Sequence, residues 1–508
     1  MNENMSGGSL THEEVARRSV SGAASSLVIR TVSASLKFAR TILLARLINP
    51  DQFGIVGLAL VFVQFLDTIG TFGLNMQLIR SEKLTDENVS THFWLRMGLQ
   101  SLMVVATLLL VLSFRYIYPD RILLPTVTMV LGVIWFVQAS YSTQEAVLAH
   151  QVNFQRTILL ELASSAVTLL VSPLLAWWGW EVWSIVFGIY FVNTLVFFVG
   201  LILYRIPWRP SLSFNAALAR ENLRFGWTVV VGKQLTYALD QFDDFWAGSA
   251  LGNLALGFYE RAFQFARYPR QVIAEPLSGV FFTMYAKFQN DRSLLSRSFF
   301  ISNSFILRLN GLFSLIFFVI APEFVGQLLG AQWLPMVFTF QLMIVYCFLD
   351  PLILSAGNLL IAVGEPGLLT RNRFTQMIIF VPLVIGLAHW HEIEGIAVAA
   401  DIMLLVGVIG LLRLARRYVN YSAGKLFFPP LLALGIAVPA GLLFPDLFAI
   451  SNPWMLMLVK ATVASVVYIL TLLLLEASSY QRMAAEFRTI LPQPYAKLFG
   501  RIFREASE

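Results

Sequence analysis

The side chains best placed to do chemistry in this sequence are cations inside strongly apolar stretches. In LKFARTILLARLINPDQFG, residues 36–54, Lys37, Arg40 and Arg46 interrupt a run that otherwise resembles a membrane span. A charged side chain near the centre of a bilayer costs at least ~2.5–3.5 kcal/mol on insertion scales. Cations retained there therefore indicate a wet cavity and an anionic ligand such as phosphate, which arginine binds through two parallel hydrogen bonds.

The spacing of these cations predicts a polar stripe along one helix. At about 100° per residue, Arg30, Ser33, Lys37 and Arg40 fall within one narrow sector, and apolar residues occupy the rest of the helix. A second charged helix is expected over 225–248. Such helices face lipid or protein on one side and water or a polar ligand on the other.

Acidic residues accompany the cations on the second charged helix and its neighbours. Lys233, Asp240 and Asp244 share one face of that helix, and Asp243 lies beside it. The candidate substrate-binding cations are Arg30, Lys37, Arg40, Lys233, Arg261 and Arg267. The candidate coupling or ion-pairing acids are Asp67, Asp240, Asp243, Asp244 and Glu275.

The clustered acids repel one another, which suits exchange of a proton or binding of a sodium ion. The pattern does not say which ion couples transport. We expect no resident cofactor and no metal site. Cys347 is the single cysteine, and the five histidines show no metal-ligand spacing.

Composition places these helices in a membrane. The chain has 508 residues, of which 57% are hydrophobic and 13% charged, and its mean hydropathy is +0.71. An apolar share of this size predicts an all-α polytopic membrane protein. About fourteen transmembrane helices are expected, over 22–47, 53–79, 92–114, 122–146, 157–177, 182–204, 225–248, 254–285, 299–320, 333–361, 372–388, 395–413, 427–444 and 453–476.

Loop charges predict the orientation. The loops after even-numbered spans and both termini carry most of the basic loop residues, whereas the opposite loops hold only Arg46, Arg115 and Arg121. The positive-inside rule then places both termini in the cytoplasm. The net charge of +6 is explained by loops facing anionic lipid, so no nucleic-acid partner is expected. Arg96 and Lys460 are expected to snorkel towards the membrane surface.

A weak internal repeat suggests two lobes. A shift of 203 residues aligns Arg30 with Lys233, Gly54 with Gly257, and Phe62 with Phe265. Six intervening helices give both copies the same direction, as in parallel repeats about an axis normal to the membrane. The expected parts are a cytoplasmic tail (1–18), an N-lobe (19–206), a C-lobe (207–415), a helix pair (425–476) and an amphipathic cytoplasmic tail (477–508).

These lobes are expected to face each other across a cleft lined by the first, second, seventh and eighth helices. A purely structural interpretation pairs Lys37 and Arg40 with Asp240 and Asp243 across that cleft. The cationic surplus on the first helix, which carries no acid of its own within the stripe, favours an anionic ligand instead.

The run ARLINPDQFGIVGLA (45–59), followed by FLDTIGTFGLNMQLIR (65–80), resembles the start of the polysaccharide transporter family. These are Wzx-type oligosaccharide flippases of the MOP superfamily, and the colanic-acid and succinoglycan exporter branch is most similar. ALDQFDDFWAGSALGNLALGFYERA (238–262) resembles the family's acidic seventh helix and the turn after it, although Phe245 follows the acids where the family usually has Asn.

The resemblance, over roughly residues 18–415, implies a non-enzymatic flippase in the bacterial inner membrane. It implies translocation of undecaprenyl-diphosphate-linked repeat units by alternating access, for exopolysaccharide or lipopolysaccharide biosynthesis. Membrane lipid, polysaccharide polymerase and chain-length proteins are the partners it suggests. A drug or cation antiporter on the same fold and a membrane polymerase or glycosyltransferase remain as alternatives. The basic stripe disfavours the antiporter, and the short extracytoplasmic loops disfavour the enzyme.

Overall fold

The computed structural model describes residues 12–81, 84–151, 154–203, 210–444 and 450–490, and these form helices joined by short turns. The chain divides into two compact units, residues 1–260 and 261–508. The first contains α1 (His12–Leu47), α2 (Pro50–Thr71), α3 (Leu74–Arg80), α4 (Asp86–Ile117), α5 (Leu123–His150), α6 (Phe154–Trp177), α7 (Val182–Ile185), the π-helix η1 (Val186–Phe191), α8 (Val192–Leu203), α9 (Ala216–Trp246) and the π-helix η2 (Ala247–Leu251).

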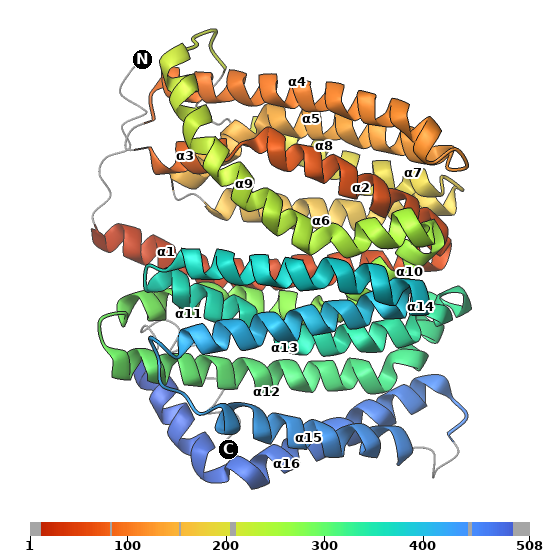
Figure 1. The fold of residues 1–508 in the computed structure, drawn as a ribbon, viewed down its shortest axis with the longest axis vertical. Coiled ribbons are helices and arrows are strands. Elements are labelled where there is room, and N and C mark those ends of the chain that lie inside the picture. Colours follow the sequence, from red (N-terminus) through yellow and green to blue (C-terminus); the bar gives the residue numbers. More distant parts are fainter. Residues whose placement is uncertain (1–11, 82–83, 152–153, 204–209, 445–449, 491–508) are drawn as a thin grey trace. The chain divides into compact units, whose positions relative to one another are not determined.

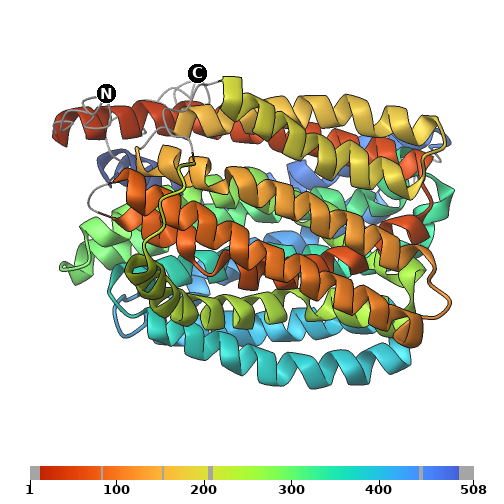
Figure 2. The same ribbon diagram turned by 90° about the horizontal axis from the view of Figure 1, so that it is seen from above.

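The helix α10 (Asn253–Ala266) begins in the first unit and ends in the second. The second unit continues with the π-helix η3 (Arg270–Ala274), α11 (Glu275–Lys287), α12 (Arg292–Phe324), the π-helix η4 (Val325–Leu329), the 3-10 helix η5 (Ala331–Met336), α13 (Val337–Ala362), α14 (Pro366–Ala415), α15 (Ala423–Leu443) and α16 (Pro453–Ile490). Within each unit the long helices run roughly along a common direction (Figures 1 and 2).

Among the described residues, ten helices are long and apolar enough to cross a membrane. One of them, α14, is two helices joined at a kink, where His391 and Glu392 leave helical geometry. The charged helices α1 and α9 and the interrupted segment α10–α11 are not among the ten. They match the predicted spans that carry all the candidate site residues except Asp67, which lies on α2. The expectation of an all-α membrane protein with about fourteen spans is therefore confirmed.

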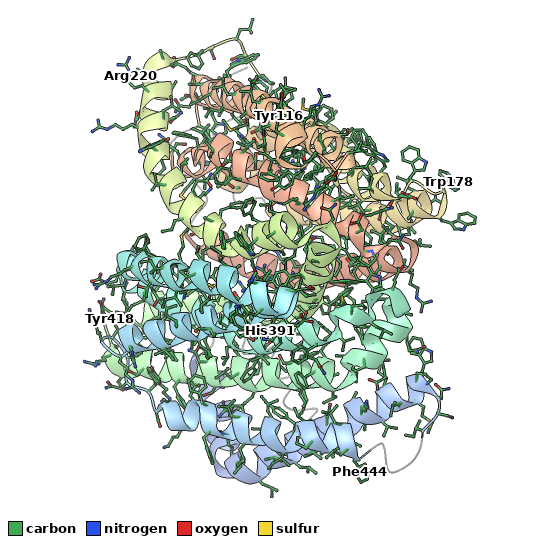
Figure 3. All side chains as sticks on the ribbon, turned by 45° about the vertical axis from the view of Figure 1, so that its right-hand side comes forward. Tyr116, Trp178, Arg220, His391, Tyr418 and Phe444 are labelled. Atoms are coloured by element: carbon green, nitrogen blue, oxygen red, sulfur yellow. The ribbon has the colours of Figure 1, made fainter. Side chains whose placement is uncertain are left out.

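Exposed tryptophans mark the turn between α6 and α7. Trp177, Trp178 and Trp180 are 73%, 62% and 46% exposed, and Trp178 projects outward (Figure 3). Tryptophan is enriched where a membrane meets water, because its ring is apolar and its N–H is polar. These side chains are placed as an interfacial anchor would be.

The order of helices repeats along the chain. With a shift of 203 residues, α1 corresponds to α9, α2 to α10 and α4 to α12. The last helix of each copy begins after a glutamate in the same rare backbone conformation, Glu181 (φ 44°, ψ −123°) and Glu392 (φ 45°, ψ −126°). Positive φ is uncommon outside glycine. Its recurrence at matching turns supports the predicted parallel repeat.

The two copies meet in a reciprocal contact inside the first unit. A Cβ added to Gly54 would collide with the carbonyl of Asn253, and one added to Gly257 would collide with the carbonyl of Pro50. Pro50 and Asn253 are themselves 203 residues apart. The first residue of α2 thus contacts the fifth residue of α10, and the first residue of α10 contacts the fifth residue of α2. The same reciprocity is found at a two-fold axis between subunits. Only glycine allows the helix starts to approach this closely.

The second and eighth spans are both interrupted. The predicted continuous span 53–79 is corrected, because α2 ends at Thr71 and α3 starts at Leu74. Between them Phe72 and Gly73 adopt positive φ (45° and 65°). A hydropathy pattern cannot detect this break, since the residues on both sides of it are apolar. The eighth span, predicted over 254–285, breaks near Pro269, because α10 stops at Ala266 before η3.

The helix α9 belongs to the first unit. It crosses α2, α3 and α4 (Figure 1). Arg121, in the turn between α4 and α5, donates to the carbonyl of Gly248 (2.6 Å) in η2, which continues α9. Tyr118 Oη donates to Ser249 Oγ (2.8 Å), also in η2. The predicted lobe boundary at 206/207 is drawn from the sequence repeat, whereas α9 packs with the helices before that boundary. The boundary therefore stays a prediction.

The second unit has a continuous core among α11, α12, α13 and α14, which includes Phe299, Leu307, Leu352, Leu359 and Leu411. In Figure 1 the helices α12, α13 and α14 run side by side. Buried bulky side chains of this kind contribute roughly 1.5–3 kcal/mol each through removal from solvent. In a membrane the packing against neighbouring helices replaces part of that driving force.

Two buried ion pairs attach α16 to α12. Arg308 pairs with Glu476, and their side chains are 7% and 9% exposed. Lys460 Nζ lies 2.6 Å from Glu323 Oε1, so the expectation that Lys460 snorkels is wrong. The predicted tail 477–508 begins as part of α16, which continues to Ile490. Its amphipathic character depends on side chains outside the described residues.

Candidate functional site: a basic stripe and buried ion pairs

The basic stripe on α1 faces α6. Lys37 Nζ lies 2.8 Å from Glu161 Oε1, and Arg40 Nη1 donates to Thr168 Oγ1 (2.9 Å). Arg30, about two turns before Lys37 on the same helix, is exposed. The helical spacing therefore does place the three cations along one side of α1, as the wheel predicts.

The contact between Lys37 and Glu161 is a weak one. Their side chains are 46% and 36% exposed, and exposed pairs contribute roughly 0–1 kcal/mol because water and ions screen them. An incoming anion could take the place of the carboxylate at little energetic cost. Glu161 thus positions the lysine through an ion pair that is weak enough to be exchanged for another anion.

The partner of Lys37 was missed by the sequence prediction. Within the described residues Lys37 pairs with Glu161 and not with Asp240 or Asp243, so the structural interpretation of a cross-lobe pair does not hold for this lysine in the observed conformation. Glu161 could have been found, because it is the only charged residue in the predicted span 157–177. A lone acid in a span needs a partner.

The candidate acids of α9 lie in different surroundings. Asp243 is 8% exposed and accepts a hydrogen bond from the fully buried Tyr259 (2.7 Å), whereas Lys233 and Asp240 are exposed. Tyr237, on the face predicted to be polar, donates to the carbonyl of Val61 on α2 (2.7 Å). The predicted polar face of α9 is therefore partly used for packing against α2.

Asp67 has a structural partner. Arg96 Nη2 lies 3.0 Å from Asp67 Oδ1, and Arg96 Nη1 donates to Gln100 (2.6 Å). Arg96 is 4% exposed, so the expectation that it snorkels is wrong. The arginine points into the protein because Asp67 on α2 provides a carboxylate for an ion pair, whereas the hydrocarbon of the bilayer has no hydrogen-bond acceptor. Asp67 is thereby paired with α4, so its charge is already neutralised and the proposal that it couples transport has less support.

The remaining candidates, Arg261, Arg267 and Glu275, lie in the second unit. Arg261 is buried and donates to Gln264. Arg267 Nη2 lies 3.7 Å from Glu275 Oε1. This acid also meets Arg270 Nε at 3.3 Å.

Arg270 joins this group to α13. It pairs with Asp350, which is 5% exposed. Neither residue is in the predicted candidate set. Asp350 is the only charged residue of the predicted span 333–361, the same signal that Glu161 carries. The second unit thus holds a compact network of two arginines and two acids beside the interrupted eighth span.

The described residues include no cluster of three His, Cys, Asp or Glu side chains arranged to hold a metal ion. What the observed groups can do is bind an anion, through guanidinium and ammonium groups whose present partners are carboxylates. Phosphate competes for the same hydrogen-bond donors with comparable geometry. The arrangement therefore supplies charge and hydrogen-bond donors for binding.

Known proteins share both sequence and fold with this chain. Residues 43–338 match the sequence model of the family described as "Polysaccharide biosynthesis protein". The chain is similar to lipopolysaccharide biosynthesis protein WzxC of Escherichia coli, with 24% identity over 72% of this chain and 75% of that one. It is also similar to succinoglycan biosynthesis transport protein ExoT of Rhizobium meliloti, with 26% identity over 61% and 62%.

Among solved structures, the inward closed conformation of the lipid II flippase MurJ superposes with a TM-score of 0.66 at 14% identity, covering 89% of this chain and 98% of that chain. At this identity the match shows a shared fold. The arrangement of helices over most of this chain has thus been seen in another protein.

Proposed function

Because the chain belongs to the polysaccharide biosynthesis protein family, we propose that it is a flippase for lipid-linked oligosaccharides in the bacterial inner membrane. The cargo is an undecaprenyl-diphosphate-linked repeat unit for exopolysaccharide or lipopolysaccharide assembly. The observation that carries the proposal is the basic stripe of α1, in a chain whose relatives are named for polysaccharide biosynthesis and transport.

The proposed mechanism is alternating access by two six-helix lobes, residues 19–206 and 207–415, in a chain with both termini in the cytoplasm. Arg30, Lys37 and Arg40 engage the diphosphate, and Lys233, Arg261 and Arg267 are the proposed contacts from the second copy. The weak Lys37–Glu161 pair supports this role, since the lysine can exchange a carboxylate for a phosphate oxygen at little cost.

Resetting the carrier requires a change of charge in the empty site. Asp240, Asp243, Asp244 and Glu275 are the proposed acids for this step, through a proton or a sodium ion. Asp67 remains in the proposed set with less support, since Arg96 already neutralises it. Polymerase and chain-length proteins are proposed partners, because the transported unit must next be polymerised.

The test is polysaccharide export in a strain that lacks the gene. It is complemented with the wild type, with Lys37→Ala/Arg40→Ala, or with Lys37→Glu/Arg40→Glu, at matched membrane levels. We expect the alanine pair to lower export by about tenfold or more, and the charge-reversed pair to abolish it, because a diphosphate is then repelled. Lipid-linked repeat units should accumulate on the cytoplasmic side.

Glu161→Gln is the matched control. It removes the partner of Lys37 while leaving the lysine in place, so export should be kept. Full export by the charge-reversed variant would show that these cations do not bind cargo. A strain that exports normally without the gene, and with no accumulation of lipid-linked units, would reject the flippase assignment itself.

A further inference from the structure

A polar pocket lies in the first unit, away from the basic stripe. Its volume is about 330 Å³, at the lower end of the ~300–1,000 Å³ typical of small-ligand sites. It is formed by α3, the start of α4 and the first turns of α9. The lining residues are Leu74, Gln77, Leu78, Ser81, Asn88, His92, Leu218, Glu221, Asn222 and Phe225.

Next to this pocket, hydrogen bonds join α4 to the segment just before α9. The Asn215 amide donates to Glu87 Oε1 (3.0 Å), and the Asn215 backbone N–H donates to Thr91 Oγ1 (3.0 Å). Trp94 Nε1 donates to the carbonyl of Ser211 (2.8 Å). A site whose walls are already in place loses little conformational freedom when a ligand binds.

One buried polar atom in the lining lacks a partner. His92 is 2% exposed, and its ring is held by Thr143 Oγ1, 3.0 Å from Nδ1, and by a hydrogen bond with the Leu74 backbone. The Oε1 of Gln77, in contrast, forms no hydrogen bond within the described structure. Buried polar groups are rarely left unsatisfied, so this oxygen calls for a ligand or water.

The chemistry of the lining selects an uncharged, polyhydroxylated ligand. Three amides, one imidazole and one hydroxyl offer both donors and acceptors, and the single charged lining residue is acidic. Of the ten lining residues none is Lys or Arg, so a phosphate would meet no cation and one carboxylate. A lipid chain would leave the amides unpaired, at a cost of roughly 1–3 kcal/mol each.

We propose that this pocket binds one uncharged sugar ring. Ring hydroxyls form hydrogen bonds with Gln77 Oε1 and the Asn222 amide, and the apolar face of the ring packs on Phe225. The inference rests on the proposed function, in which the ring belongs to the oligosaccharide of the lipid-linked cargo. It adds a neutral sugar subsite to the cationic diphosphate site.

The test uses the full-length protein in lipid nanodiscs. Binding of methyl glucoside and methyl galactoside is followed by saturation-transfer NMR, with inorganic phosphate as competitor. The wild type should show transfer from at least one glycoside, unaffected by phosphate. Asn222→Trp should weaken binding by about tenfold or more by filling the pocket, equivalent to ~1.4 kcal/mol. Asn222→Ala should weaken it less, by removing one hydrogen-bonding group.

Arg220→Trp is the matched control, since Arg220 is an exposed neighbour on α9 that does not line the pocket (Figure 3). It should bind as the wild type does. Absence of transfer from both glycosides, unchanged binding in Asn222→Trp, or displacement by phosphate would each overturn the inference.

The export assay separates this inference from the proposed function. Normal export by the wild type without glycoside binding overturns the pocket and leaves the flippase. Glycoside binding in a protein whose loss causes no accumulation of lipid-linked units overturns the flippase and leaves the pocket as a sugar site.

Discussion

Single acids inside apolar spans identify the helix pairings of this protein. Asp67, Glu161 and Asp350 are each the only charged residue in their predicted spans. Each meets a cation on another helix, namely Arg96, Lys37 or Arg270. Of these cations, sequence reasoning selected only Lys37, because it belongs to a stripe. It passed over two of the three acids because an isolated residue has no periodicity, although the cost of burying one unpaired charge is the stronger signal.

The pair of Arg96 and Asp67 gives a direct test of a structural role at this scale. Arg96→Met leaves a carboxylate that is only partly solvated, so we expect a loss of unfolding free energy towards the lower end of the ~3–5 kcal/mol typical of broken buried pairs. Arg96→Met/Asp67→Leu removes both charges and should recover most of it. Thermal unfolding of the purified protein, followed by tryptophan fluorescence, measures both.

If Asp67 has only this structural role, the double variant also exports polysaccharide at close to the wild-type level. Loss of export in a double variant that is as stable as the wild type would instead return Asp67 to the coupling residues. Equal instability of the single and double variants would show that the pair is not what holds α2 to α4.

At the scale of elements, apolar length predicted where helices lie and could not predict where they break. The spans follow from runs of about 20 apolar residues, the length that a bilayer requires. The turn at Phe72 and Gly73 lies within such a run, and the π-helices η1, η2 and η4 are equally apolar. The break near Pro269 is the one with a visible cause in the sequence, because proline disrupts regular helix hydrogen bonding.

The contribution of the pair of Arg308 and Glu476 to holding α16 on α12 can be tested at this scale. Arg308→Met leaves Glu476 buried without its cation, at a cost of about 3–5 kcal/mol, while the pair of Lys460 and Glu323 remains. The loss should appear locally as faster amide hydrogen exchange in α15 and α16. Exchange in α4 and α5 should be unchanged. Mass spectrometry of peptides from both regions measures this.

Lys37→Met provides the comparison, since it breaks an exposed ion pair and should cost less than ~1 kcal/mol. Unaltered exchange in α15 and α16 of the Arg308→Met protein would mean that apolar packing alone holds the C-terminal helices. Faster exchange throughout the chain would mean that the pair stabilises the whole fold and not one element.

At the scale of the whole chain, the repeat was visible in sequence only as a few aligned residues. Gly54 and Gly257 aligned without any indication that they touch. The structure brings them together because the two copies approach at the same point from opposite sides, and a contact of this kind exists only when both copies are folded. The predicted orientation places this contact at the extracytoplasmic side, where a transporter with alternating access must open and close.

Gly54→Ala and Gly257→Ala therefore test whether the reciprocal contact is part of transport. Each added methyl meets a backbone carbonyl, which no side-chain rotation can relieve, so α2 and α10 must separate at their starts. We expect export to fall by about tenfold, equivalent to ~1.4 kcal/mol, with the protein still present in the membrane. Gly232 lies on α9, and a Cβ added there meets open space. Gly232→Ala should therefore export normally. It should also gain roughly 0.5–1 kcal/mol of stability, because alanine is a better helix former than glycine. Normal export by both contact variants would mean that the close approach of the two copies is a resting arrangement which the transport cycle does not need.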